Sequence, residues 1–171
     1  MADPDVSFSP LRREDVPLVH AWRQREHVRR WWSGVETLDE AEAKYLPRIE
    51  GRDPTAVYLI VLADRPIGMI QTYMFDDYRE VWPIELEPGV AGVDLFIGEP
   101  GLIGRGLGSE IVSAFVRDVV FANPDVSACV ADPDVRNQAS IRAFEKAGFV
   151  RFETFEAPDA EAPQLLLRIE R

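Results

Sequence analysis

The chain has 171 residues, a formal net charge of −11 and a hydrophobic share of 46%, which is typical of one globular domain, here expected over residues 1–171. The acidic balance argues against nucleic acid and anionic membranes as partners, and no apolar run approaches the roughly 20 residues that span a bilayer. The single cysteine, Cys129, excludes an internal disulfide framework. Together with an acidic N-terminus that lacks a secretory signal, it leads us to expect a cytoplasmic protein.

Up to Gly89 the sequence predicts alternating strands and helices. Val6 to Leu11 alternate between apolar and polar side chains, as in a half-buried strand. Thr37 and Glu40 match a capping box, in which two side chains bond backbone N–H groups at the start of a helix. We expect a strand at 6–11, a helix from 14, a short helix at 28–32, a helix after 37 that stops at 51, strands at 57–62 and 67–75, and a loop at 76–89.

The second half begins with an apolar strand, 90–97, that contains one acid, Asp94. His20 and His27 lack the spacing of metal ligands, so we expect no metal site, and Cys129 reads as a buried thiol in a strand. Helices mixed with mostly antiparallel strands predict the α+β class, or α/β by looser definitions. After 97 we expect a glycine-rich loop, a helix from 109, a strand at 126–131, a helix at 137–147 and an antiparallel pair at 149–156 and 164–169.

The glycine-rich loop, Gly104 to Gly108, precedes a helix, and bare backbone N–H groups beside a helix N-terminus favour phosphate. An ordinary tight turn between a strand and a helix is the alternative. No Gly-Lys-Ser/Thr follows, which excludes a Walker loop, and the N-terminus lacks the strand–loop–helix–strand start of a Rossmann fold. Because Asp94 lies a few residues upstream, the pattern suggests chemistry beside a phosphorylated cofactor.

A second segment, Asn137 to Phe149, resembles the second cofactor motif of the GNAT acetyltransferase superfamily: Asn, Ala or Ser, an aromatic residue, Glu-Lys and Gly-Phe. The glycine loop about 30 residues earlier resembles the first motif, although Ile103 replaces the usual Gln or Arg. The resemblance implies acetyl-CoA as cosubstrate and the GNAT fold, a mixed, mostly antiparallel sheet that splays at the acetyl-CoA site and carries flanking helices. The cofactor-binding residues it implies are Phe96, Ile97, Gly104, Arg105, Gly106, Leu107, Gly108, Ser109, Asn137 and Phe144.

A narrower resemblance, to the aminoglycoside 6'-N-acetyltransferases, covers most of the chain. It implies that the antibiotic pocket is lined by aromatic and acidic side chains and that Asp94 lies next to the amine that is acetylated. The matching pieces are His27-Val28, Trp31–Gly34, Lys44–Pro47, Pro66–Gly68, Gln71–Tyr73, Trp82, Glu87–Val90, Gly92–Asp94 and Asp132-Pro133.

An aminoglycoside is a polycation, so its pocket needs carboxylates for charge-assisted hydrogen bonds and flat aromatic faces for sugar rings and ammonium groups. Trp82 lies in a proline-rich loop, where an aromatic residue needs a reason, and a pocket is the favoured one. For Glu85 a solvated surface position is the alternative. Asp94 lies within an apolar strand, where a carboxylate must be paired or used. The predicted substrate-binding residues are Trp32, Tyr45, Gln71, Tyr73, Trp82, Glu85, Glu87, Asp94, Asp132 and Asp159.

For the reaction we expect Asp94 to be the catalytic residue: it holds the substrate ammonium and accepts its proton, directly or through water, before the amine attacks the thioester. A backbone N–H of Leu95 to Ile97 would stabilise the oxyanion. Phe144 occupies a position where many GNAT enzymes carry a tyrosine whose hydroxyl protonates the leaving thiolate, so that proton must come from water or another group.

Two alternatives share the cofactor motifs: a GNAT acyltransferase for another amine, such as a siderophore lysine side chain or a protein N-terminus, and a module that binds without turnover. The acidic and aromatic loop from Asp76 to Glu87 favours an aminoglycoside as substrate. Asp94 argues against a module that binds without turnover. A siderophore enzyme often carries a histidine near its chemistry, and none follows His27. The sequence leaves monomer and homodimer open.

Overall fold

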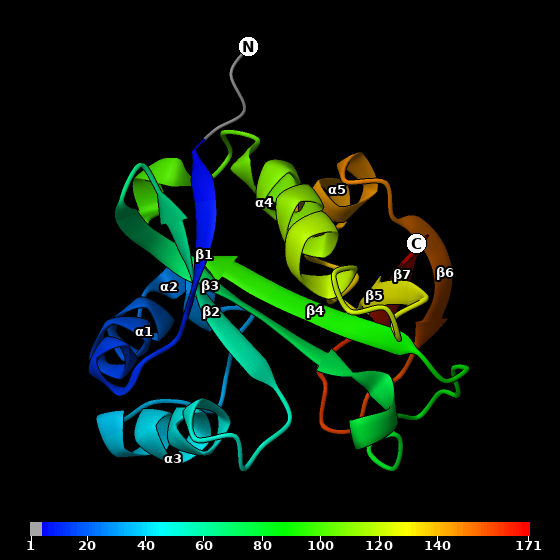
Figure 1. The fold of residues 1–171 in the computed structure, drawn as a ribbon, viewed down its shortest axis with the longest axis horizontal. Coiled ribbons are helices and arrows are strands. Elements are labelled where there is room, and N and C mark those ends of the chain that lie inside the picture. Colours follow the sequence, from blue (N-terminus) through cyan, green and yellow to red (C-terminus); the bar gives the residue numbers. More distant parts are fainter. Residues whose placement is uncertain (1–4) are drawn as a thin grey trace. The chain divides into compact units, whose positions relative to one another are not determined.

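The computed structural model describes residues 5–171, and residues 1–4, part of the acidic N-terminus noted above, lie outside it (Figure 1). The contacts within the chain divide it into two compact units. The first comprises the chain up to Gln71 together with Leu95–Ile103, and the second comprises Thr72–Asp94 together with Gly104–Arg171. No helix in the described part is long and apolar enough to cross a membrane. The expectation of one domain over 1–171 stays a prediction.

The first unit contains three helices that precede a β-hairpin. The predicted capping box is present: the Glu40 backbone N–H donates to Thr37 Oγ1 at 3.2 Å, and the Thr37 N–H donates to the Glu40 carboxylate at 2.9 Å. Val6 in the first strand lies opposite Leu62 in the second, and the two strands run antiparallel. The elements are β1 (Val6–Pro10), α1 (Val16–Arg23), α2 (Glu26–Arg29), α3 (Leu38–Ile49), β2 (Ala56–Leu62) and the first part of β3 (Arg65–Met74).

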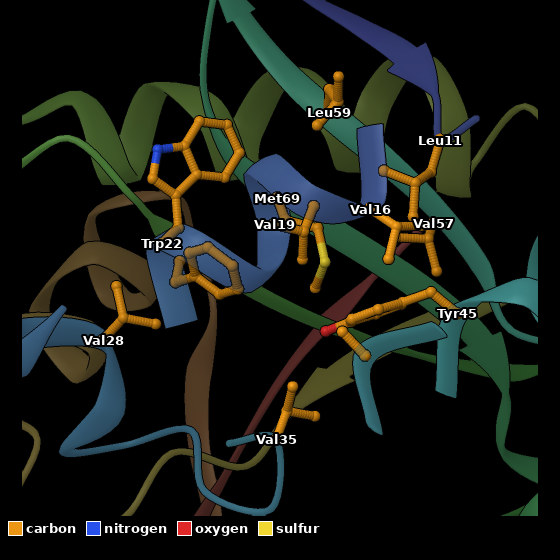
Figure 2. Close-up of a cluster of buried hydrophobic side chains, with 12 residues drawn as sticks. Leu11, Val16, Val19, Trp22, Val28, Val35, Tyr45, Val57, Leu59 and Met69 are labelled. Atoms are coloured by element: carbon orange, nitrogen blue, oxygen red, sulfur yellow. The ribbon is translucent and has the colours of Figure 1, made fainter. Parts of the chain in front are cut away.

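A cluster of buried apolar side chains, which we call the first core, joins α1, α3 and the hairpin (Figure 2). Val16, Val19 and Trp22 fill it from α1, as their helical spacing predicts, and Tyr45 reaches it from α3 with 0% of its surface exposed. Met69 contributes from β3. This burial gives the first unit its stability, since it removes large apolar side chains from water.

The second unit contains the site described below. β5 runs parallel to β4, and β7 runs antiparallel to both β5 and β6. The predicted antiparallel pair at the C-terminus is confirmed. The elements are η2 (Phe75–Tyr78), β4 (Val90–Ile97, whose end belongs to the first unit), α4 (Leu107–Phe115), a π-helical turn (Val116–Val120), β5 (Ala128–Ala131), α5 (Gln138–Lys146), β6 (Val150–Phe155) and β7 (Gln164–Glu170).

The seven strands follow the order β1-β2-β3-β4-β5-β7-β6. β4 and β5 run parallel, whereas β1 with β2, β5 with β7 and β6 with β7 run antiparallel, and the predicted mixed and mostly antiparallel sheet is confirmed. Several boundaries differ from expectation: the short helix expected at 28–32 spans Glu26–Arg29, and the strand expected at 126–131 begins at Ala128. The helix expected from Ser109 begins at Leu107, because Gly106 takes a left-handed φ of 81° and serves as its N-cap. The segment 76–89 was expected to be loop throughout, but it begins within the 3-10 turn η2, because Arg79 bonds the Asp76 carboxylate there.

Candidate active site

Two acids are brought together by the register of the parallel pair. Gly92 of β4 lies opposite Val130 of β5. Two residues further on, Asp94 lies in β4 and Asp132 directly follows the end of β5, so continued strand alternation brings both side chains to the same face of the sheet. Sequence separation hides this pairing, because nothing local relates two residues 38 positions apart. The register thus supports their assignment to one site.

The electrostatics agree with this geometry. Burial and the neighbouring Asp94 carboxylate raise the pKa of Asp132 well above its ordinary value. Burial, Asp94 and Asp132 likewise raise the pKa of Tyr73, so its phenol is neutral at physiological pH. Two carboxylates this close cannot both ionise without cost, and a cation placed between them would relieve that cost. The cluster is therefore built to favour a positively charged ligand.

A second core of apolar and aromatic side chains lies in the same unit, and Val90 shares its face of β4 with Asp94. Phe75, Val90 and Val130 are buried in this second core. Trp82 is half-buried at the edge of that core, with its ring 5.4 Å from Phe75 and 5.7 Å from Phe155. The packing anchors one side of the indole, and the part that remains exposed is available to a ligand. Substrate contact by Trp82 stays a prediction.

The other predicted acids of this unit lie in loops. Glu87 is paired with Arg168, which lowers the pKa of its carboxyl group below the ordinary value. Its charge is thus already balanced within the chain. Glu85 is exposed, and Asp159 is exposed with a φ of 62°, a left-handed conformation that aspartate tolerates better than most residues. Substrate roles for these three residues stay predictions.

The predicted substrate residues of the first unit are mainly packing residues in this structure. Tyr45 is fully buried, and its hydroxyl accepts a hydrogen bond from Arg23 at 2.8 Å. Gln71 is 7% exposed and accepts a bond from Arg48 at 2.9 Å. Trp32 is half-buried, with the Arg23 guanidinium 5.4 Å from its ring centroid. Direct contact with substrate is therefore least supported for Tyr45, which has no exposed surface.

Sequence reasoning missed Arg23, a guanidinium that is 2% exposed. It donates to Tyr45 and to the carbonyl of Ser33 at 2.6 Å, and so ties α1 to α3 and to the segment that carries Trp32. A signal was available: Arg23 lies four residues after Val19 on the buried stripe of α1. A charged residue at that spacing must find polar partners inside the protein.

The end of β4, which includes the predicted cofactor residues Phe96 and Ile97, is held by polar contacts that the sequence did not reveal. His27 Nε2 lies 3.0 Å from the Ile97 carbonyl oxygen, and because a carbonyl only accepts, Nε2 carries the hydrogen. Arg25 donates to the Gly98 carbonyl at 2.6 Å. The ring of Trp32 meets Phe96 edge-on at 5.1 Å. These contacts fix the strand end, including its backbone N–H groups.

The glycine loop leaves space and backbone N–H groups at the start of α4. Gly104 and Gly106 adopt left-handed φ values of 75° and 81°, and a Cβ built on either would meet nothing within 4 Å. Among residues 5–171 no side chain caps the N-terminus of α4, so its first N–H groups and its dipole face the loop. Ser109 Oγ donates to the Gly106 carbonyl at 3.0 Å and stabilises the turn. These residues fit the phosphates of acetyl-CoA.

The remaining predicted cofactor residues have structural roles as well. Arg105 is exposed, and Leu107 is half-buried at the start of α4. Asn137 caps α5, its side chain accepting from the Ser140 N–H at 3.2 Å. Phe144 is 3% exposed and packs edge-on against Phe149 at 5.1 Å. Their contacts with acetyl-CoA stay predictions.

No group of three or more His, Cys, Asp or Glu side chains suited to a metal ion occurs among residues 5–171. Cys129 is buried, as expected from its strand neighbours. Burial and Asp94 raise the pKa of its thiol, which leaves it protonated and a poor nucleophile. The chemistry of the cluster thus rests on its carboxylates and its phenol.

Comparison with known proteins identifies the family to which the chain belongs. A model of the acetyltransferase (GNAT) domain family matches residues 12–157. Aminoglycoside N(6')-acetyltransferase type 1 of Klebsiella pneumoniae is 33% identical over 161 residues, which cover 92% of this chain and 80% of that protein. The solved structure of AAC(6')-Ib with coenzyme A and kanamycin superimposes with a TM-score of 0.89 at 31% identity, covering 98% of this chain and 95% of the other.

A more distant structure, the spermidine N-acetyltransferase of Vibrio cholerae, has 18% identity and a TM-score of 0.75, covering 96% of this chain and 95% of the other, and shares the fold. The GNAT fold expected from the two cofactor motifs is thereby confirmed. Enzymes of this family use acetyl-CoA, and solved relatives contain coenzyme A. This chain therefore belongs to the GNAT acetyltransferase family and is related to the aminoglycoside 6'-N-acetyltransferases.

Proposed function

We propose that this enzyme transfers the acetyl group of acetyl-CoA to the 6'-amino group of an aminoglycoside, by direct attack in a ternary complex. The observation that carries the proposal is the cluster of Asp94, Asp132 and Tyr73 in the second unit, whose members interact electrostatically. A neutral or anionic acceptor would gain nothing from two crowded carboxylates. A polyamine gains from both.

In this mechanism Asp94 performs the proton transfer. Its carboxylate first holds the substrate ammonium and then accepts a proton from it, so that the free amine can attack. Asp132 stabilises the same positive charge from the neighbouring strand. Because burial favours its protonated form, binding of a cation should draw the proton off Asp132 and strengthen the contact. Much of the rate enhancement would come from the alignment of the reacting groups.

Acetyl-CoA supplies the activated acetyl group as a thioester. The N–H groups of the glycine loop and of the α4 N-terminus would hold its pyrophosphate. A backbone N–H of Leu95 to Ile97, held by the contacts of His27 and Arg25 to the carbonyls of Ile97 and Gly98, would bind the developing oxyanion. Phe144 has no hydroxyl, so the leaving thiolate takes its proton from water or another group.

The test is thiol release from acetyl-CoA with kanamycin, tobramycin and gentamicin as acceptors. Wild type should turn over saturably, and Asp94→Asn should lose at least about a hundredfold in kcat, which is the low end of general-base contributions. Asp118→Asn is the matched control, since Asp118 is exposed and paired with Arg117. Turnover with peptide N-termini or lysine side chains, and none with the antibiotics, would refute the aminoglycoside as substrate. The assignment as an acetyltransferase would remain.

A further inference from the structure

Gly92 occupies a position where the backbone does not require glycine. It lies inside β4 in the pairing register with Val130, and its φ is outside the left-handed range of the positive-φ glycines. Glycine weakens a strand interior, so its presence there indicates a close approach by another group. That group is Tyr73.

The ring of Tyr73 fills the space that a side chain at residue 92 would take. A Cβ built on Gly92 would lie 2.3 Å from Tyr73 Cζ, 2.5 Å from Cε2 and 2.6 Å from the hydroxyl oxygen. Thr72 Oγ1 donates to the Gly92 carbonyl at 2.9 Å, and Tyr78 meets the Tyr73 ring edge-on at 5.3 Å. The phenol is thus held against the bare backbone of Gly92.

The position of Gly92 relative to the acids gives this packing a functional meaning. Gly92 and Asp94 are two residues apart on one strand, so the Tyr73 ring over Gly92 lies on the face from which Asp94 projects. Asp132 directly follows β5 and interacts electrostatically with both Asp94 and Tyr73. We propose that Gly92 is a positioning residue that seats the Tyr73 hydroxyl beside Asp94 and Asp132 and thereby sets the geometry with which the site receives the substrate ammonium.

This inference rests on the proposed function for its kinetic consequence. An alanine at 92 would displace the phenol by about 1 Å to reach ordinary contact distance. The neutral hydroxyl would then leave its position beside the two carboxylates. If the phenol contributes one hydrogen bond to the bound charged substrate, its displacement should raise the KM for an aminoglycoside about tenfold. The KM for acetyl-CoA should not change, because the phosphates bind elsewhere in the chain.

A double-mutant cycle tests the coupling. Gly92→Ala should raise the KM for kanamycin in the wild-type background and have no further effect in a Tyr73→Ala background, where the ring is gone. Gly101→Ala is the matched control, because a Cβ there would meet nothing within 4 Å. Equal effects of Gly92→Ala in both backgrounds, or an unchanged KM with lowered stability, would overturn the proposal. If Gly92→Ala alone does not fold, the double variant should fold, and its failure to fold would also overturn it.

A second readout does not depend on the acceptor. Tyrosine labelled with carbon-13 at Cζ reports the titration of all 4 tyrosines by NMR, and Tyr73→Phe identifies the signal. In wild type, the pKa of Tyr73 should lie well above the ordinary tyrosine value, and Gly92→Ala should lower it as the ring leaves the carboxylates. An identical titration in both proteins would refute the positioning role. If Gly92→Ala changes the pKa of Tyr73 but wild type acetylates no aminoglycoside, the positioning role of Gly92 is supported and only the proposed substrate class is refuted.

Discussion

The substitution Tyr45→Phe distinguishes a substrate-binding role of Tyr45 from a structural role in the first core. The sequence predicted a substrate contact, whereas the structure buries the ring and bonds its hydroxyl to Arg23. Burial raises the pKa of the phenol against the opposing effect of Arg23, so the hydroxyl is neutral and accepts from the guanidinium. Tyr45→Phe removes that acceptor and changes little else. We therefore expect a loss of stability without a change in substrate binding.

The size of the loss follows from the partners of Arg23. Among the residues that the structure describes, the guanidinium has two hydrogen-bond acceptors, Tyr45 Oη and the Ser33 carbonyl, and its Nε has none. Hydrogen bonds to charged groups contribute about 1.5–3 kcal/mol. Each kcal/mol shifts Tm by about 2–4 °C in a chain of this size, so Tm should fall by about 3–12 °C.

Urea unfolding followed by circular dichroism measures this effect, and an unchanged slope would show that only stability has altered. The double variant Arg23→Met with Tyr45→Phe should lose less than the sum of the single variants, because it removes the stranded charge with its partner. Unchanged stability combined with a raised KM for kanamycin would refute the core assignment and restore the predicted substrate contact.

Three further outcomes are expected. Because burial and Asp94 raise the pKa of Asp132 in the folded state, the wild type loses stability as pH rises above the unfolded pKa of about 4. Asp132→Asn should therefore resist urea better than wild type at pH 7, and the gap should close as pH falls toward about 4; a constant gap would contradict this sign. Phe144→Tyr should change kcat by less than about tenfold, and a hundredfold gain in steady-state assays would mean that an absent general acid limits the reaction. Gly98→Ala should cost about 1–3 kcal/mol in urea unfolding, because its Cβ would lie 2.2 Å from Trp22 Cγ; wild-type stability would show that the indole is free to move.

Local features were predictable because each depends on neighbours in the chain. The capping box at Thr37, the strand from Val90 to Ile97 and the final antiparallel pair all appear as expected. The two cofactor motifs are also local, since a glycine loop and the helix that follows it form one continuous segment. This is why the family could be inferred from sequence and then confirmed by comparison.

What only the tertiary structure decided is which side chains meet. Asp94 and Asp132 become neighbours through the register of two parallel strands, and no periodicity in either strand encodes that register. Tyr45 matched a pocket motif, yet the first core takes the whole side chain, because α3 turns it toward Arg23 and Met69. In the sequence, Gly92 is only a residue that weakens a strand. The structure shows that the Tyr73 ring occupies the space that a side chain at residue 92 would take. Sequence thus determined the elements and the cofactor loop, whereas long-range packing, which depends on residues far apart in the chain, determined the charge and shape of the site.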